Sequence, residues 1–289
     1  MLKLIFTTLM LLIILSMAHA QKLPNKQEVS LWAPFDIKID GRAEEWGNKY
    51  QAYNKATEVF YTIANDQDNL YLVIHATKSR IIEKIIEGGV SFIMKTEHIG
   101  NDMVLFPLLS LNKARSILLT AGKSLNEDIN SPSAMLQKVQ PDAYEKIAKS
   151  IANANKQLTE SLKEIKLNGV STVTDTVPNV NPETPYYRFL PMRDHHYKII
   201  GIDNKYDIKA MAQFDTDGSL TYELKLPIKY LNNVGNDANI DYTITINGRG
   251  EDRRPDNIIS RSRLDFKMLN EDMETATDFS SQYTFAKKP

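Results

Sequence analysis

Two stretches of the sequence carry side chains of the types that bind sugars. A sugar ring stacks its C–H face on an aromatic ring, while its hydroxyl groups pair with planar polar groups held in place. Residues 186–197 and 247–254 each offer such groups, with guanidinium side chains suited to carboxylates in both. The candidate ligand-binding residues are Tyr186, Tyr187, Arg188, Arg193, His195, His196, Asn247 and Arg249. The alternative is ordinary loop surface with ion pairs.

The turn at residues 65–69 carries candidate ligands for calcium. A hard cation takes several oxygen ligands that converge on one point, and the side chains that could provide them are Asn65, Asp66 and Asp68. This hairpin tip supplies only part of such a set. The alternative is a solvated turn, because Asp and Asn side chains bond their own backbone and tolerate left-handed conformations.

The sequence contains no recognised catalytic motif. Gly-x-Ser-x-Gly, His-Glu-x-x-His and the phosphate-binding loop are all absent. The adjacent carboxylates Glu44 and Glu45 would point to opposite faces of an extended segment, which does not suit glycosidic chemistry. The pair His195-His196 has no third ligand at a recognised metal spacing. We therefore predict a protein that is not an enzyme.

The first residues have the pattern of an export signal. Lys3 precedes an almost wholly apolar run at residues 4–17, and residues 18–20 form a small-x-small cleavage site. We expect residues 1–20 to be removed and no membrane span to remain, with an uncleaved N-terminal anchor as the alternative. The predicted location is therefore exported, either periplasmic or extracellular.

Composition limits the choice of partners and of stabilising forces. The formal net charge is −1, so nothing in the balance of charges favours nucleic acid or an anionic membrane surface. The chain contains no cysteine. An exported protein without disulfides must be stabilised by its hydrophobic core, which a chain of this length can form.

Alternation of apolar and polar residues predicts β-strands in the first and last thirds of the chain. Residues 35–95 have a β pattern, and within them residues 57–64 and 70–75 form a hairpin. A second hairpin is expected at residues 206–226, around a turn that ends in Gly218. Further strands are predicted at residues 90–94, 241–247, 258–266 and 279–285.

The middle of the chain predicts a helical insertion at residues 133–168. Pro141 suits a first helical turn, and Asn168-Gly169 is a good stop signal. Apolar residues recur at helical spacing along this segment, namely Tyr144, Ile147, Ile151, Ala154, Leu158 and Ile165. Such a stripe either packs against the β domain or, where it is exposed, docks a protein partner.

Three short motifs occur in a fixed order along the chain. They read Ile39-Asp40-Gly41 with Glu45-Trp46, then Asn65-Asp66 with Asn69-Leu70-Tyr71-Leu72, and finally Tyr222-Glu223-Leu224-Lys225-Leu226-Pro227. In this order they resemble the family 9 carbohydrate-binding module and its DOMON-like relatives. The resemblance covers the N-terminal and last thirds and lapses across residues 100–195. We expect Trp46 to pack under the sandwich, and Gly41 to permit a tight turn in which Asp40 accepts backbone hydrogen bonds.

The resemblance implies a fold and a domain organisation. The expected fold is mainly β, an antiparallel β-sandwich of jelly-roll or immunoglobulin-like form and of the family 9 type, with the helical insertion at residues 133–168. A lead-in at residues 21–34 would precede a single domain at residues 35–289.

The resemblance also implies a function. It is non-catalytic recognition of a glycan through loop residues, with no cofactor other than calcium. The alternative is an envelope partner-binding or structural protein that uses the helical insertion. Some DOMON-like domains carry haem through His and Met; the matching residue types here are His75, Met94 and Met103, for which ordinary core or surface positions are the alternative.

Overall fold

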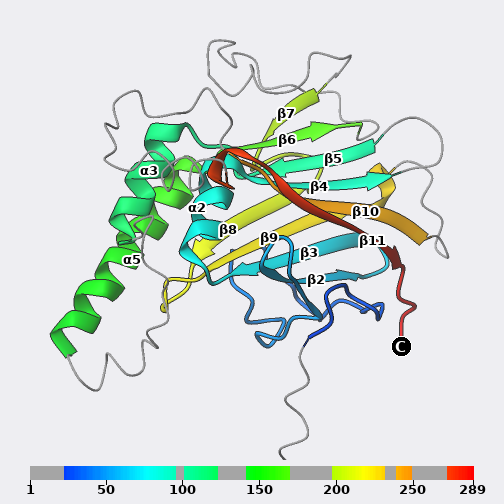
Figure 1. Cartoon of the computed structure of the whole chain (residues 1–289). Helices are drawn as coiled ribbons and strands as arrows, with labels where there is room; N and C mark the ends of the chain where they lie inside the picture. Colours follow the sequence, from blue (N-terminus) through cyan, green and yellow to red (C-terminus); the bar gives the residue numbers. More distant parts are fainter. Residues whose placement is uncertain (1–22, 96–100, 123–140, 170–196, 232–238, 249–271) are drawn as a thin grey trace, which may run out of the picture.

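The computed structural model describes residues 23–95, 101–122, 141–169, 197–231, 239–248 and 272–289. Over these residues the chain is mainly β, with two antiparallel sheets and a group of helices at one side (Figure 1). The predicted class is therefore confirmed. The proposed signal at residues 1–20 and the strand predicted at 258–266 lie outside the described residues.

Two sheets make up the β part. The five-stranded sheet has the order β1 (Ala52–Asn54), β2 (Val59–Asn65), β3 (Asn69–Ala76), β9 (Leu220–Pro227) and β8 (Lys209–Phe214). The six-stranded sheet has the order β11 (Thr277–Thr284), β10 (Asn239–Ile246), β4 (Val90–Lys95), β5 (Asn101–Phe106), β6 (Glu164–Asn168) and β7 (Tyr197–Gly201). The named helices of the described residues are α2 (Ser79–Gly88), α3 (Leu111–Thr120), α5 (Pro141–Ser161) and the 3₁₀ turn η2 (Ile228–Tyr230), and residues 272–274 form one further helical turn.

The two sheets pack face to face around one hydrophobic core. Alternate side chains along each strand point into it, as period-two sequences require. Tyr61 of β2 and Tyr242 of β10 meet across the core, with their hydroxyl oxygens 3.1 Å apart. One continuous cluster of buried residues includes side chains of both sheets and of all three α-helices. This shared core holds the described elements together.

The outer face of the five-stranded sheet is covered by the N-terminal segment, residues 31–50. Trp46 lies here, 7% exposed, in a second apolar cluster with Tyr71 and Val73 of β3. The Trp46 and Tyr71 rings meet edge to face with centroids 6.1 Å apart. The prediction that Trp46 packs under the sandwich is confirmed. The sheet is thus buried on both faces, which accounts for the near-continuous burial of β2 and β3.

The lead-in is part of the fold from Leu23 onward. The side-chain amide of Gln27 accepts from the Ile63 amide at 2.7 Å and donates to the Ile63 carbonyl at 2.7 Å, as a neighbouring strand would. Further along, the Ala33 amide donates to the Asn65 carbonyl beside a parallel bridge of Trp32 with Asn65. These contacts extend the sheet edge beyond β1.

Within the predicted helical insertion, the helix start at Pro141 is confirmed and the end at residue 168 is wrong, while residues 133–140 lie outside the described residues. Helix α5 begins at Pro141 as predicted, but it ends at Ser161, and β6 follows at Glu164. Ile165 and Leu167 are buried on alternate positions of this strand. Ile165 was predicted to belong to the helix because it lies seven residues after Leu158, a spacing that suits a helix. The same residue also suits the start of a strand.

Helix α5 covers the edge of the five-stranded sheet. Ile151, Ala154 and Leu158 are buried against α3 and β8, whereas Ile147 is 38% exposed where the N-terminal end of the helix extends past the sheets (Figure 1). The Asn155 amide exchanges two hydrogen bonds with the Phe214 backbone, at 2.8 and 2.9 Å. The stripe from Ile151 onward is therefore used in packing, which leaves little of it for a partner.

Two helices were not expected. Helix α2 interrupts the stretch predicted to be β, and α3 lies in the part of the chain without a sequence assignment. Ile81, Ile82, Ile85 and Ile86 are all buried on one side of α2. Their spacing is helical, but they lie within the stretch 35–95 that was predicted to be β as a whole, and β-branched residues favour strands.

Candidate functional site

Most of the loop residues predicted to bind a ligand lie outside the described residues. They are Tyr186, Tyr187, Arg188, Arg193, His195, His196 and Arg249. Asn247 is described and has a structural role. Its side-chain amide donates to the Gly89 carbonyl at 3.1 Å and to the Ser91 hydroxyl at 2.9 Å, which fixes the turn between α2 and β4.

Two of the three candidate calcium ligands, Asn65 and Asp66, are engaged with protein groups. The Asn65 oxygen accepts from the Tyr283 hydroxyl and the Ala286 amide, and its nitrogen donates to two carbonyls, so its bonding capacity is full. Asp66 accepts from the amides of Asp68 and Asn69 and from the Tyr71 hydroxyl. Burial acts to raise the pKa of Asp66, but these donors outweigh it and hold the pKa below its usual value.

Asp68 is exposed in this turn. Among the described residues, no three His, Cys, Asp or Glu side chains form a group that could hold a metal ion. The geometry is that of a turn closed by the Asp66 carboxylate. Calcium binding stays a prediction.

The first and last sequence motifs meet at one buried carboxylate. Glu223 of β9 accepts from the backbone amides of Asp40 and Gly41, at 3.1 and 2.9 Å, and from Trp46 Nε1 at 3.0 Å. Gly41 has φ +83°, and a Cβ there would lie 2.8 Å from the Gln213 nitrogen, so the turn needs glycine. Asp40 accepts from the Arg42 amide at 3.0 Å, as predicted.

This carboxylate is unusual in its electrostatics. Burial raises the pKa of Glu223 to about 7, although the three N–H donors act in the opposite direction. The arrangement anchors the N-terminal segment to the sheet. The first and last sequence motifs therefore have a structural role together, because their residues form one hydrogen-bonded contact at Glu223.

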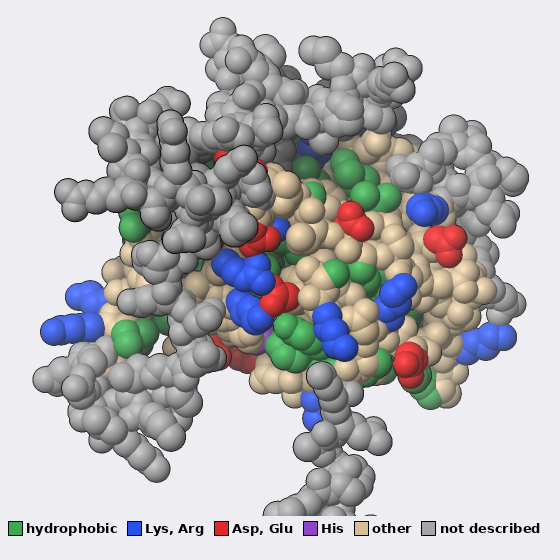
Figure 2. Space-filling model, viewed as in Figure 1, with side chains coloured by type: hydrophobic (Ala, Val, Ile, Leu, Met, Phe, Trp, Pro, Cys, Tyr) green, Lys and Arg blue, Asp and Glu red, His purple; other side chains and the backbone are tan. Residues whose placement is uncertain are grey.

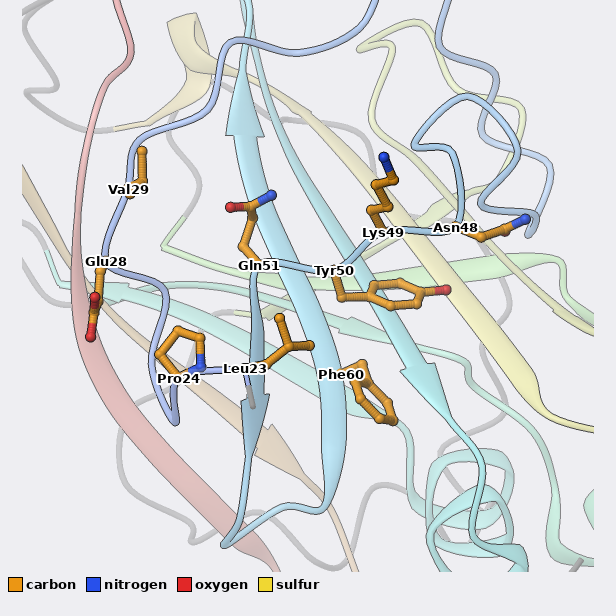
Figure 3. A pocket seen from close by; sticks show the side chains of 9 residues that line it. All are labelled: Leu23, Pro24, Glu28, Val29, Asn48, Lys49, Tyr50, Gln51 and Phe60. Carbon is orange, nitrogen blue, oxygen red and sulfur yellow. The ribbon is translucent and has the colours of Figure 1, made fainter. Parts of the chain in front are cut away.

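A surface groove of about 650 Å³ lies beside this anchor and is open to solvent (Figure 3). The lead-in forms one wall, and the segment before β1 together with β2 forms the other. The lining side chains are Leu23, Pro24, Glu28, Val29, Asn48, Lys49, Tyr50, Gln51 and Phe60. Apolar, aromatic, amide and charged groups are thus mixed in a concave surface.

Aromatic rings form the wall on the β2 side. Tyr50 is stacked on His75 of β3, with centroids 5.1 Å apart and planes 13° from parallel. Phe60 is tilted against Tyr50 at 5.9 Å and is supported by Tyr53 at 4.7 Å. Because one face of Tyr50 rests on a sheet residue, its other face points away from the sheet. The wall is held in place by packing.

A polar cluster supports the stacked pair from below. Phe60, His75 and Thr221 are cross-strand neighbours on the outer face of β2, β3 and β9. His75 Nδ1 lies 3.2 Å from Thr221 Oγ1, which in turn donates to Asp215 Oδ2 at 3.0 Å. The Thr221 proton is used toward Asp215, which suits the His75 tautomer that carries its proton on Nδ1 and donates to Thr221.

Burial shifts the pKa values of His75 and Asp215, the two residues at the ends of this chain of hydrogen bonds. It lowers the pKa of His75 and raises the pKa of Asp215, while their mutual attraction opposes both shifts. His75 Nδ1 is 3.5 Å from Asp215 Oδ2, and the two side chains are 16% and 34% exposed. A neutral His75 is therefore favoured near neutral pH.

The residue types considered for haem do not converge. Met94 is fully buried in the core between the sheets, whereas His75 is on the outer face of β3 under Tyr50. Met103 is on β5, in the six-stranded sheet, whereas His75 is in the five-stranded sheet. Haem binding through these residues thus has no support from their placement.

The described surface carries charges of both signs. On the face shown in Figure 2, Lys and Arg side chains are interspersed with Asp and Glu, in keeping with the net charge of −1. Within the described ranges, no helix is long and apolar enough to cross a membrane. The mixture of charges on this face does not point to a nucleic-acid partner.

Comparison with known proteins gives no relative for this chain. No family model matches it, and searches of the curated proteins and of the solved structures found no match.

The groove was missed by sequence reasoning. Tyr50, Tyr53 and Phe60 are close in the sequence, and their aromatic spacing was a usable signal. His75, Thr221 and the lead-in come from distant segments, and only the sheet register brings them together.

Proposed function

We propose that the protein binds a carbohydrate, without catalysis, in the groove lined by Tyr50 and Phe60. The observation that carries this proposal is the Tyr50 ring, fixed by His75 on one face and turned away from the sheet on the other. A rigid aromatic face in a concave surface is what the C–H face of a sugar ring requires.

Polar groups for the sugar hydroxyls line the same groove. The amides of Asn48 and Gln51 each offer both a donor and an acceptor, which matches the dual character of a hydroxyl. Glu28 adds an acceptor and Lys49 a donor. The lining contains one acid and one base, so it has no net charge of its own.

This proposal keeps the predicted function and moves its site. The sandwich of family 9 type, the export of the chain and the absence of catalysis remain parts of the proposal, supported by the three sequence motifs and the N-terminal pattern. The loop residues Tyr187 and Arg249 are the competing site.

A glycan array probed with the purified protein, with and without calcium, tests this proposal. We expect saturable binding to one class of glycan. Tyr50→Ala should weaken it about two- to tenfold, because stacking of one ring contributes about 0.5–1.5 kcal/mol beyond area burial. Phe35→Ala is the matched control, since Phe35 is 90% exposed on the same N-terminal segment but does not line the groove.

The outcomes separate the candidate sites. Loss of binding in Tyr187→Ala or Arg249→Ala, with Tyr50→Ala unaffected, would return the site to the loops. Binding that needs calcium would favour the turn at residues 65–69 as a site. Absence of binding to every glycan would reject the proposal.

A further inference from the structure

Tyr50 and His75 are coupled through their stacking. The Tyr50 ring covers one face of the imidazole, and Phe60 stands beside it with centroids 6.2 Å apart. His75 Nδ1 pairs with the Thr221 hydroxyl, which in turn donates to Asp215. In the neutral ring that uses Nδ1 as donor, Nε2 carries no proton.

We propose that His75 is a positioning residue for the Tyr50 wall, and that protonation of its Nε2 loosens Tyr50 and weakens binding in the groove. The binding part of this inference rests on the proposed function, whereas the positioning part does not. The coupling is reciprocal. If Tyr50 disfavours the imidazolium by covering it, then protonation of His75 disfavours the covered arrangement by the same free energy.

Charged groups act on this pair from several elements. Asp215 and Asp217, in the turn between β8 and β9, favour the imidazolium. The Tyr50 hydroxyl pairs with Thr221 and is within electrostatic reach of Asp215, Glu223 and Asp217. Lys49 precedes Tyr50 in the chain. The ring face of Tyr50 also attracts a cation weakly. Burial outweighs the attraction of the carboxylates, so the neutral imidazole is the form that suits the packed wall.

The first test is a titration of the histidine Cε1–H resonances by NMR, which needs no glycan. The His75 signal is assigned by its loss in His75→Phe. We expect its midpoint in the native protein to lie below the ordinary value of about 6.5. In Tyr50→Leu it should rise by about half a pH unit or more, because the imidazole becomes exposed.

Tyr53→Leu is the matched control for this titration. Tyr53 supports Phe60 from the side and is not stacked on His75, so the His75 midpoint should stay unchanged. An equal midpoint in the native protein and in Tyr50→Leu would overturn the inference.

The second test follows the wall itself by hydrogen exchange of the Gln51 amide. This amide donates to the Tyr61 carbonyl at 3.1 Å and to the Thr62 hydroxyl at 3.0 Å, directly after Tyr50. Corrected for intrinsic exchange, its protection should fall about threefold or more from pH 7.5 to pH 5. His75→Phe keeps a stacked ring without titration and should abolish the difference.

The same fall in His75→Phe would overturn the inference and assign the pH effect to another group. If His75→Phe does not fold, triple-resonance spectra of the labelled protein assign the His75 signal, and the comparison of the native protein with Tyr50→Leu still decides. A positive NMR result together with an empty glycan array would reject the proposed function and leave the positioning role of His75 intact.

Discussion

At the scale of single residues, Glu223 connects the N-terminal segment to the sheet. Its carboxylate accepts three N–H donors from residues 40–46, yet it is buried. Burial raises the pKa of Glu223 to about 7 from an ordinary value of 4.5. A raised carboxyl pKa contributes stability that is fully present below pH 4.5 and is lost as the pH rises through 7.

Glu223→Gln should remove this part of the pH dependence. Between pH 4.5 and pH 7 the native protein should lose at most about 3 kcal/mol more unfolding free energy than the variant does. Urea unfolding at a series of pH values measures the unfolding free energy of both proteins. His75 and Asp215 also titrate in both, so their contributions cancel when the two pH curves are subtracted. Glu44→Gln, at an exposed carboxylate of the same segment, should behave like the native protein. Parallel pH curves for native protein and Glu223→Gln would contradict the prediction.

Tyr222 and Tyr61 form a matched pair of core hydroxyls. Both side chains are fully buried, but Tyr222 has no hydrogen-bond partner among the described residues, whereas the Tyr61 hydroxyl accepts from the Gln27 amide and pairs with Tyr242. Tyr222→Phe should leave the unfolding free energy unchanged or raise it by up to about 2 kcal/mol. Tyr61→Phe should lower it by about 1–3 kcal/mol. Chemical denaturation compares them, and a large loss in Tyr222→Phe would reveal a partner.

At the scale of elements, side-chain amides close both edges of the five-stranded sheet. Gln27 pairs with the Ile63 backbone at one edge, and Asn155 of α5 pairs with the Phe214 backbone at the other. An edge strand with free N–H and C=O groups invites pairing with another chain. These amides satisfy the backbone and leave no continuous strand template at those positions.

Gln27→Ala should destabilise the protein because it leaves the Ile63 amide and carbonyl without their partner. We expect a loss of about 1–3 kcal/mol in unfolding free energy and faster hydrogen exchange at Ile63. Lys26→Ala, at the exposed neighbouring position, should change stability by less than about 0.5 kcal/mol. Normal protection of Ile63 in Gln27→Ala would show that water replaces the amide without loss.

Some elements could be predicted from the sequence and others could not. The hairpin of β2 and β3 was predicted within two residues at each end, because its alternation is flanked by an Asp- and Asn-rich turn. Helix α2 was missed because Ile81, Ile82, Ile85 and Ile86 satisfy β propensity and helical spacing together. The predicted end of α5 was wrong because the position of Ile165 suits both the helical spacing and the alternation of a strand.

At the scale of the whole molecule, the N-terminal segment acts as a third layer on the sandwich. Its two tryptophans, Trp32 and Trp46, are the only ones in the chain. Intrinsic fluorescence therefore reports on this layer, while far-ultraviolet circular dichroism reports on the sheets and helices. Because the layer is anchored to β2, β3 and β9, we expect thermal unfolding to show the same midpoint by both methods. A fluorescence transition at lower temperature would mean that the layer detaches first.

The candidate site belongs to this scale as well. Tyr50 and Phe60 are only ten residues apart, but the groove exists because the lead-in returns along the sheet and because register places His75 beside Thr221. The local sequence indicates secondary-structure propensity and the period of apolar residues. It does not indicate which residues of distant strands pair with one another. The aromatic wall was therefore within reach of sequence analysis, and the concave surface was not.

Asn65 joins three parts of the chain that are distant in sequence. Its backbone pairs with the lead-in at Leu31 and Ala33, and its side chain holds Ala286 near the other end. A force applied at the C-terminal end would therefore load the Asn65 side chain at the end of β2. Asn65→Ala keeps the backbone pairing with the lead-in, so in single-molecule pulling we expect only the residues after β11 to detach at lower force.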